Sequence, residues 1–137
     1  MSGFIWVAFG GALGAVCRYA ISLIPVKTTF PILTLVTNLI GAVLIGFIVG
    51  IVSSKQDVSA NSVLFWKTGV CGGFTTFSTF SLEAFTLFEN KAYVSGGIYV
   101  ALSILGCIAG VFIGKKLAML FGGDRYENFR KLCSLPV

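Results

Sequence analysis

The residues best placed to bind an ion form one stretch of nine, Gly-Gly-Phe-Thr-Thr-Phe-Ser-Thr-Phe, at positions 72–80. Each glycine weakens a helix by about 1 kcal/mol relative to alanine, and threonines favour caps and turns over helix interiors. We therefore expect a broken helix here, which would expose carbonyls on one side and amide donors on the other, as at many membrane ion sites. The pattern fits a kinked packing site of small residues equally well, so both interpretations stay open.

The composition indicates the environment that surrounds this stretch. Of the 137 residues, 56% are hydrophobic and 11% are charged, whereas soluble proteins carry roughly 25% charged residues. We therefore predict an integral membrane protein made of one domain, residues 1–137. The net charge of +5 is modest, and we expect it to contact anionic lipid in the bilayer and to set orientation, with no role in nucleic-acid binding.

Histidine and cysteine usage argues against a side-chain metal site. The chain has no histidine, the commonest metal ligand and proton shuttle. Four cysteines are spread along it without zinc spacing or a disulfide framework, and we interpret them as small apolar fillers: Cys17, Cys71, Cys107 and Cys133.

Four apolar runs are long enough to cross a bilayer as helices, which predicts an all-α membrane protein with a break in its third span. The first run exceeds a signal-peptide core, so we expect it to be retained. The predicted spans are 3–24, 32–53, 63–88 and 92–114, with 121 as an alternative end of the last, and residues 122–137 form a charged tail.

Small residues recur every four positions in three of these spans. This spacing creates a face on which two helix backbones approach closely. We expect such contacts at Gly10 and Gly14, at Ala42, Gly46 and Gly50, and at Gly106, Gly110 and Gly114.

Three polar residues stand out inside the spans. Three roles are open for Arg18: its side chain extends to the membrane interface, it forms a structural ion pair, or it attracts anions electrostatically. Asn38 fits either an amide that holds helices together or a donor lining a polar pathway. Glu83 is the only acidic residue within an apolar run, and intramembrane carboxylates are functional candidates, although a water-exposed or hydrogen-bonded structural Glu fits equally well.

The fourth span carries a polar stripe, because Tyr99, Ser103 and Cys107 are four residues apart. Such a stripe either joins helices or forms the wall of a polar path.

The charges in the loops give only a weak signal for membrane orientation. Seven Lys and Arg residues lie on the side of the termini and three on the other, but without the tail the counts are four and three. A chain with so little bias is expected to insert in both orientations.

Three motifs together resemble the Fluc/CrcB fluoride-channel family: the nine residues at 72–80, Thr-x-x-x-Asn from Thr34 to Asn38, and Gly-x-x-x-Arg from Gly14 to Arg18. The resemblance covers all four spans. It implies a dual-topology homodimer of antiparallel subunits with two fluoride pores and a central structural sodium ion. It also implies passive export of fluoride across the plasma or inner membrane, which protects the cytoplasm.

Carried over residue by residue, the resemblance places the sodium ion on the carbonyls of Gly72 and Thr75. It assigns the pore to Asn38, Phe77 and Phe80. It also implies a polar track through Tyr99 and Ser103 of the fourth span. Members often continue this track with hydroxyls one and two turns further, where this sequence has Cys107 and Val111. Hydroxyls can replace the tightly held water of fluoride, so we add Ser78 and Ser81, and the positive ring edges of phenylalanines suit an anion. We expect an electrostatic or structural role for Arg18 and Glu83.

Two other classes of function compete with a channel. A small proton-coupled multidrug exporter needs a membrane carboxylate in its first span, and residues 3–24 contain none. In a structural membrane subunit the polar residues would only hold helices together. An enzyme is not expected, since the sequence offers no buried acid–base pair.

Overall fold

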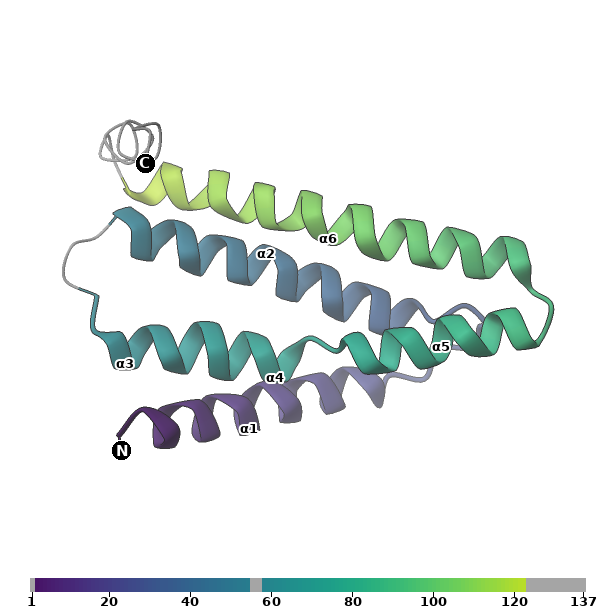
Figure 1. The fold of residues 1–137 in the computed structure, drawn as a ribbon, viewed down its shortest axis with the longest axis horizontal. Coiled ribbons are helices and arrows are strands. Elements are labelled where there is room, and N and C mark those ends of the chain that lie inside the picture. Colours follow the sequence, from purple (N-terminus) through teal and green to yellow (C-terminus); the bar gives the residue numbers. More distant parts are fainter. Residues whose placement is uncertain (1, 55–57, 123–137) are drawn as a thin grey trace, which may run out of the picture.

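The computed structural model describes residues 2–54 and 58–122, and all regular structure within them is helical (Figure 1). Three helices are long and apolar enough to cross a membrane, namely Gly3–Ser22, Ile32–Ser54 and Tyr93–Phe121, which indicates a multi-pass membrane protein. The predicted charged tail, from residue 123, lies outside the described residues. In chain order the elements are α1 (Ser2–Ser22), α2 (Ile32–Ser54), α3 (Ala60–Val63), the π-helical η1 (Leu64–Cys71), α4 (Gly72–Phe74), α5 (Phe77–Glu89) and α6 (Tyr93–Gly122).

The third apolar run is made of four consecutive segments, α3 to α5, which follow one another along one line (Figure 1). It begins at Ala60, before the predicted residue 63, because the Ser59 side chain accepts the N–H of Ser62 at 3.2 Å and caps the first turn. Between α4 and α5, Thr75 (φ −80°, ψ 156°) and Thr76 (φ −147°, ψ 108°) have extended backbone. The N–H and hydroxyl of Thr75 both donate to the Cys71 carbonyl, at 3.1 and 2.9 Å, so the first half of the run ends here.

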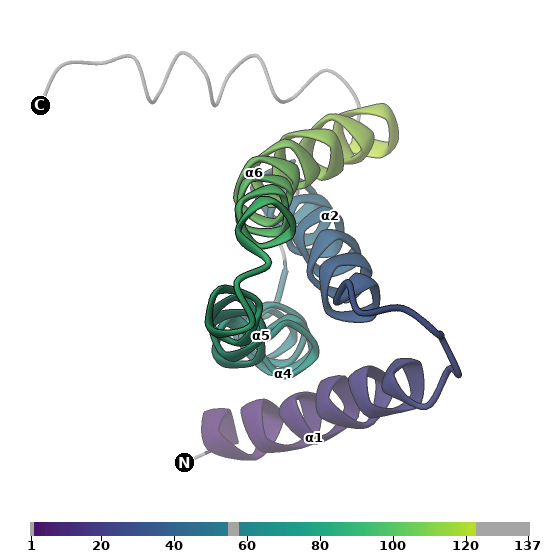
Figure 2. The ribbon, with the colours of Figure 1, turned by 90° about the vertical axis from the view of Figure 1, so that its right-hand side faces the viewer.

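The helices pack as two pairs that alternate along the sequence (Figure 2). α1 packs mainly against η1 and α4, and α2 packs mainly against α6. A Cβ atom added at Gly14 would overlap the Val70 carbonyl, and one added at Gly114 would overlap the Val43 carbonyl. The predicted close contacts are thus confirmed, but they lie within one chain and give no support of their own to a dimer.

The two pairs meet at the α5 end of the molecule. The buried residues that join them are Leu35 of α2, Phe80, Ala84 and Leu87 of α5, and Tyr99 of α6. Toward the other end the third run and the α2–α6 pair are farther apart (Figure 1), and cavities lie between them.

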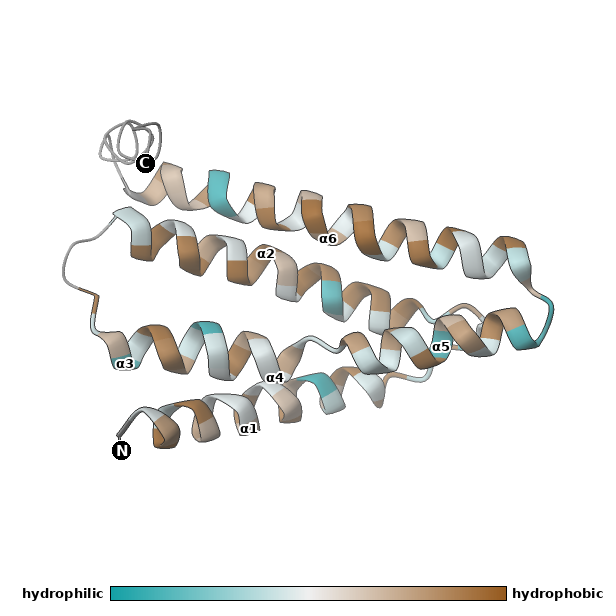
Figure 3. Ribbon diagram, viewed as in Figure 1, coloured by the Kyte–Doolittle hydropathy of each residue, from teal (hydrophilic) through white to brown (hydrophobic). Residues whose placement is uncertain are grey.

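The outer surfaces of the helices are apolar. Large side chains such as Phe9, Leu105 and Leu120 are more than two-thirds exposed. Hydropathy colouring shows few hydrophilic positions within the long helices (Figure 3). This is the distribution that lipid requires, because a bilayer solvates apolar side chains and leaves polar ones to face the interior.

Candidate functional site

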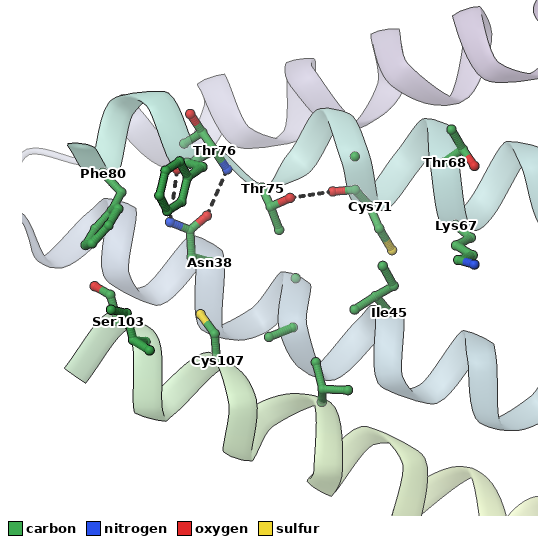
Figure 4. A pocket seen from close by; sticks show the side chains of 16 residues that line it. Asn38, Ile45, Lys67, Thr68, Cys71, Thr75, Thr76, Phe80, Ser103 and Cys107 are labelled. Carbon is green, nitrogen blue, oxygen red and sulfur yellow. Dashed lines mark hydrogen bonds between the residues drawn. The ribbon is translucent and has the colours of Figure 1, made fainter. Parts of the chain in front are cut away.

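One cavity collects most of the residues that the sequence singled out. It has a volume of about 590 Å³ and lies between α2, the third run and α6 (Figure 4). Its lining includes six of the predicted residues: Asn38, Gly72, Thr75, Phe77, Phe80 and Ser103. Side chains more than sixty residues apart in sequence thus face one space.

Asn38 holds the extended segment in place. Its Nδ2 donates to the Thr76 carbonyl at 3.2 Å, and its Oδ1 accepts the Thr76 N–H at 2.8 Å. Both polar groups of one peptide residue are therefore satisfied by one side chain, as backbone at membrane depth requires. An amide nitrogen has two N–H groups, so Asn38 keeps a second donor in addition to this bond.

These side-chain bonds release two backbone carbonyls from their ordinary helical partners. In an α-helix the Gly72 carbonyl would accept the Thr76 N–H, and the Thr75 carbonyl would accept the Thr79 N–H. Here the Thr76 N–H donates to Asn38, and the Thr79 N–H donates to the Thr76 hydroxyl at 3.2 Å. The two released carbonyls belong to the residues predicted to hold a cation, and both residues line the cavity.

Aromatic rings continue from the cavity into the core. The ring centroids of Phe77 and Phe80 are 5.5 Å apart, and those of Phe80 and Tyr99 are 5.3 Å apart. Phe77 is 78% exposed whereas Phe80 is 8% exposed and Tyr99 fully buried. Phe77 therefore stands at the open side of the cavity, and Tyr99 lies behind Phe80 and outside the cavity lining.

The predicted hydroxyls differ in how they are bonded. Ser81 donates to the Phe77 carbonyl within α5 at 2.9 Å, and Ser78 pairs with the Thr76 hydroxyl at 3.3 Å. Ser103 is only 6% exposed, and its hydroxyl has no hydrogen-bond partner within the described part of the chain. Because a buried hydroxyl without a partner is costly, Ser103 is a donor of the cavity lining that an additional ligand could satisfy. Cys107 and Val111 extend the lining beyond it.

Glu83 is hydrogen-bonded within the chain. The Thr34 hydroxyl donates to its Oε1 at 2.8 Å, and the Tyr99 hydroxyl donates to its Oε2 at 2.7 Å. The carboxylate thereby connects α2, α5 and α6 and fixes the direction of the Tyr99 hydroxyl. Of the two interpretations that the sequence left open, the hydrogen-bonded carboxylate is the one observed.

Arg18 lies on the opposite side of the extended segment, in a second cavity of about 170 Å³ between α1, α2 and α5. Its Nε is buried and has no hydrogen-bond partner among the described residues. Five hydroxyl residues share this cavity with Arg18 and Tyr19: Ser22, Thr34, Thr37, Thr76 and Thr79. Thr76 lines both cavities, so the Asn38–Thr76 pair forms the wall between them.

Sequence reasoning missed three participants. Thr76 belongs to the recognised stretch, but its central place depends on bonds to Asn38, which lies 38 residues away. Thr34 is one turn before Asn38, and this spacing was a signal that it shares the same face of α2. Lys67 was counted only for orientation, yet it lines the large cavity beside Thr68 (Figure 4).

Comparison with known proteins identifies the family to which this chain is related. Residues 5–115 match the model of the CrcB-like protein, Camphor Resistance (CrcB) family. The chain is 40% identical over 122 residues to the fluoride-specific ion channel FluC of Methanococcus maripaludis. The aligned residues cover 88% of this chain and 99% of that protein. It is 43% identical over 121 residues to the FluC of Ruminiclostridium cellulolyticum, covering 86% of this chain and 93% of the relative.

The FluC of Rhizobium johnstonii is similar at 44% identity over 121 residues, which span 83% of this chain and 97% of that protein. The region matched by the family model includes most of α1, all of α2 and the third run, and most of α6, so it contains both cavities and the Asn38–Thr76 pair. On this evidence the chain belongs to the CrcB family.

Proposed function

We propose that this protein is a fluoride channel of the cell membrane that lets fluoride leave the cytoplasm passively and thereby relieves its toxicity. The relatives are named fluoride-specific ion channels, which supports the choice of ion. The observation that carries the proposal is the cavity whose lining brings together Ser103, Asn38, Phe77 and Phe80. A channel catalyses no reaction, so the protein is not an enzyme in this proposal.

The chemistry of the cavity suits a small anion with tightly bound water. Such an ion loses its hydration only where donors replace it. Ser103 and the second N–H of Asn38 are two such donors, and the positive ring edges of Phe77 and Phe80 add weaker attraction. Ser78 and Ser81 lie on the first turns of α5 as further hydroxyls, and Tyr99 supports the ring of Phe80 from behind.

The pathway continues in this proposal through the wall formed by Asn38 and Thr76. On the far side, the second cavity offers Arg18 and five hydroxyl residues to an anion. The buried, unpartnered Nε of Arg18 is a charged donor that an anion would satisfy. Arg18 thus acts as the electrostatic lure, and Glu83 has the structural role of orienting Tyr99 and Thr34.

Two copies complete the channel by antiparallel assembly. The large cavity opens between α2, the third run and α6, and Phe77 is left exposed on it. A second copy in the opposite orientation would cover this face and give two equivalent pathways, one on each side of a two-fold axis. A reporter attached at residue 137 should then be detected on both sides of the membrane, and detection on one side alone would contradict dual topology.

The released carbonyls of Gly72 and Thr75 fit a structural sodium ion shared by the two copies. No cluster of three or more His, Cys, Asp or Glu side chains occurs among the described residues, so a cation here would depend on backbone oxygen. Four neutral carbonyls, two from each copy, suit a hard monovalent cation better than a divalent one. Replacing sodium with a larger cation should weaken the dimer by linkage, and unchanged dimer stability and transport would refute this site.

The decisive experiment measures ion efflux from liposomes that contain the purified protein. Fluoride should leave rapidly and chloride should not. Ser103→Ala and Phe80→Ile should each lower fluoride efflux, the former by about ten-fold or more, because a hydrogen bond to a charged group contributes about 1.5–3 kcal/mol. Ser95→Ala, at an exposed position of α6 outside the cavity, is the matched control. Equal fluoride and chloride efflux, or none, would refute the proposed function.

A further inference from the structure

Lys67 is a charged residue within the third run that the proposed pathway leaves without a role. It lies in the middle of η1, eight residues before Thr75, and its side chain is exposed. It lines the large cavity together with Thr68, Gly72 and Thr75 (Figure 4). A charge inside a membrane span is costly unless it faces a partner or a water-filled space, and Lys67 lies at the wall of the cavity.

The π-helical form of η1 explains how Lys67 comes to share a face with Gly72. In an α-helix, residues five apart are separated by about 140° around the axis. A π-helix bonds residues five apart, so it brings them close to the same side. The segment Leu64–Cys71 is π-helical, and Lys67 and Gly72 both line the large cavity.

No acidic side chain neutralises Lys67 within the cavity as described. None of the residues that line it is Asp or Glu. The carboxylate of Glu83 is occupied by the hydroxyls of Thr34 and Tyr99. The ammonium group is therefore a positive charge in a space whose other polar groups are largely neutral donors.

We propose that Lys67 is an anion-recruiting residue of the conduction pathway, which raises the concentration of fluoride at the mouth of the large cavity. The inference rests on the proposed function. In an antiparallel dimer with Thr75 near the two-fold axis, the first half of one third run lies beside the partner's α5, whose Glu83 is already hydrogen-bonded by its own Thr34 and Tyr99. Lys67 would then stand at the entrance that its own cavity and the partner's α5 form together.

The expected effect is modest and depends on salt. A unit charge about 8 Å from the path, in water, enriches a monovalent anion about two- to three-fold. The screening length is about 30 Å at 10 mM salt and about 3 Å at 1 M, so the enrichment vanishes at high salt. Lys67→Gln should therefore lower the initial fluoride efflux about two- to three-fold at 10 mM and leave it unchanged at 1 M.

The experiment compares fluoride efflux from liposomes at these two concentrations of potassium isethionate, with equal osmolarity on both sides. Lys67→Arg keeps the charge and should behave as the unmodified protein. Lys116→Gln is the matched control, because Lys116 is an exposed lysine of α6 that contacts the Phe112 ring and does not line the cavity. Sizing chromatography verifies that each variant assembles normally.

The outcomes separate this inference from the proposed function. If the unmodified protein passes no fluoride, the proposed function fails. If it passes fluoride and Lys67→Gln is indistinguishable from it at both salt concentrations, Lys67 only reaches for the membrane interface and the inference is overturned. A loss of equal size at both concentrations, shared by Lys67→Arg, would show a packing role and would likewise overturn it.

Discussion

Replacing Asn38 with Leu should destabilise the protein as well as block conduction. The substitution keeps the approximate volume but removes both hydrogen bonds to Thr76, the donor at 3.2 Å and the acceptor at 2.8 Å. Measured side-chain hydrogen bonds in a membrane protein average about 0.6 kcal/mol with a maximum of about 1.7 kcal/mol. Two bonds to one part-buried peptide residue therefore predict a loss of about 1–3 kcal/mol.

The neighbouring residue provides a matched control. Thr37 is buried at 3% exposure, and its hydroxyl donates to the Leu33 carbonyl at 2.7 Å. That carbonyl keeps its helical N–H partner when the hydroxyl is removed, so Thr37→Val should cost less than about 0.6 kcal/mol. Both variants differ from the parent by polar atoms on the same turn of α2.

The assay is equilibrium unfolding in mixed micelles of mild detergent and dodecyl sulfate, followed by far-ultraviolet circular dichroism. The midpoint for Asn38→Leu should shift well below that of Thr37→Val. If the two variants unfold together, the Asn38–Thr76 pair does not brace the extended segment, and the reasoning about its released carbonyls loses its foundation. A loss of fluoride efflux with unchanged stability would assign Asn38 to the pathway alone.

Two further predictions concern packing and the buried carboxylate. Gly14→Ala should lower the free energy of unfolding by about 1–3 kcal/mol through overpacking, because its Cβ would lie 2.7 Å from the Phe74 nitrogen. A Cβ at Gly11 would meet nothing within 4 Å, so Gly11→Ala should be neutral or slightly stabilising. The same unfolding titration measures both variants, and equal losses of stability would contradict the overpacking at Gly14. Glu83→Gln and Tyr99→Phe, measured singly and together, should show a coupling energy of about 1 kcal/mol from their 2.7 Å bond. Losses that simply add, within about 0.5 kcal/mol, would mean that the bond is energetically silent.

The sequence predicted which helix faces approach closely but not which helices they meet. Glycines at four-residue spacing create similar faces in α1, α2 and α6, and any two such faces can pack. The structure pairs Gly14 with the third run and Gly114 with α2. The choice depends on side-chain shape around each glycine over the whole length of the helices, and single-residue patterns do not contain that information.

The candidate site shows the same limit. The family resemblance assigned Asn38, Phe77, Phe80 and Ser103 to the pore, and the structure places all four at one cavity. Spacing could not show that Asn38 would bond Thr76, because an amide accepts and donates to any backbone group within reach. Tyr99, which the resemblance assigned to the polar track, does not line the cavity, and its hydroxyl donates to Glu83. Its place in the pathway stays a prediction.

The alternating pairing of the helices has a consequence for biosynthesis. As the chain leaves the ribosome, α1 and α2 enter the membrane first, yet neither is the other's main packing partner. The glycine face of α1 waits for η1 and α4, and that of α2 waits for α6, the last helix to be made. Each of these faces is exposed to lipid and to other nascent chains until its partner helix is inserted. Assembly of this small protein is thus completed only when α6 is inserted, so a chain that stops before α6 leaves the glycine face of α2 uncovered and becomes a substrate for membrane quality control.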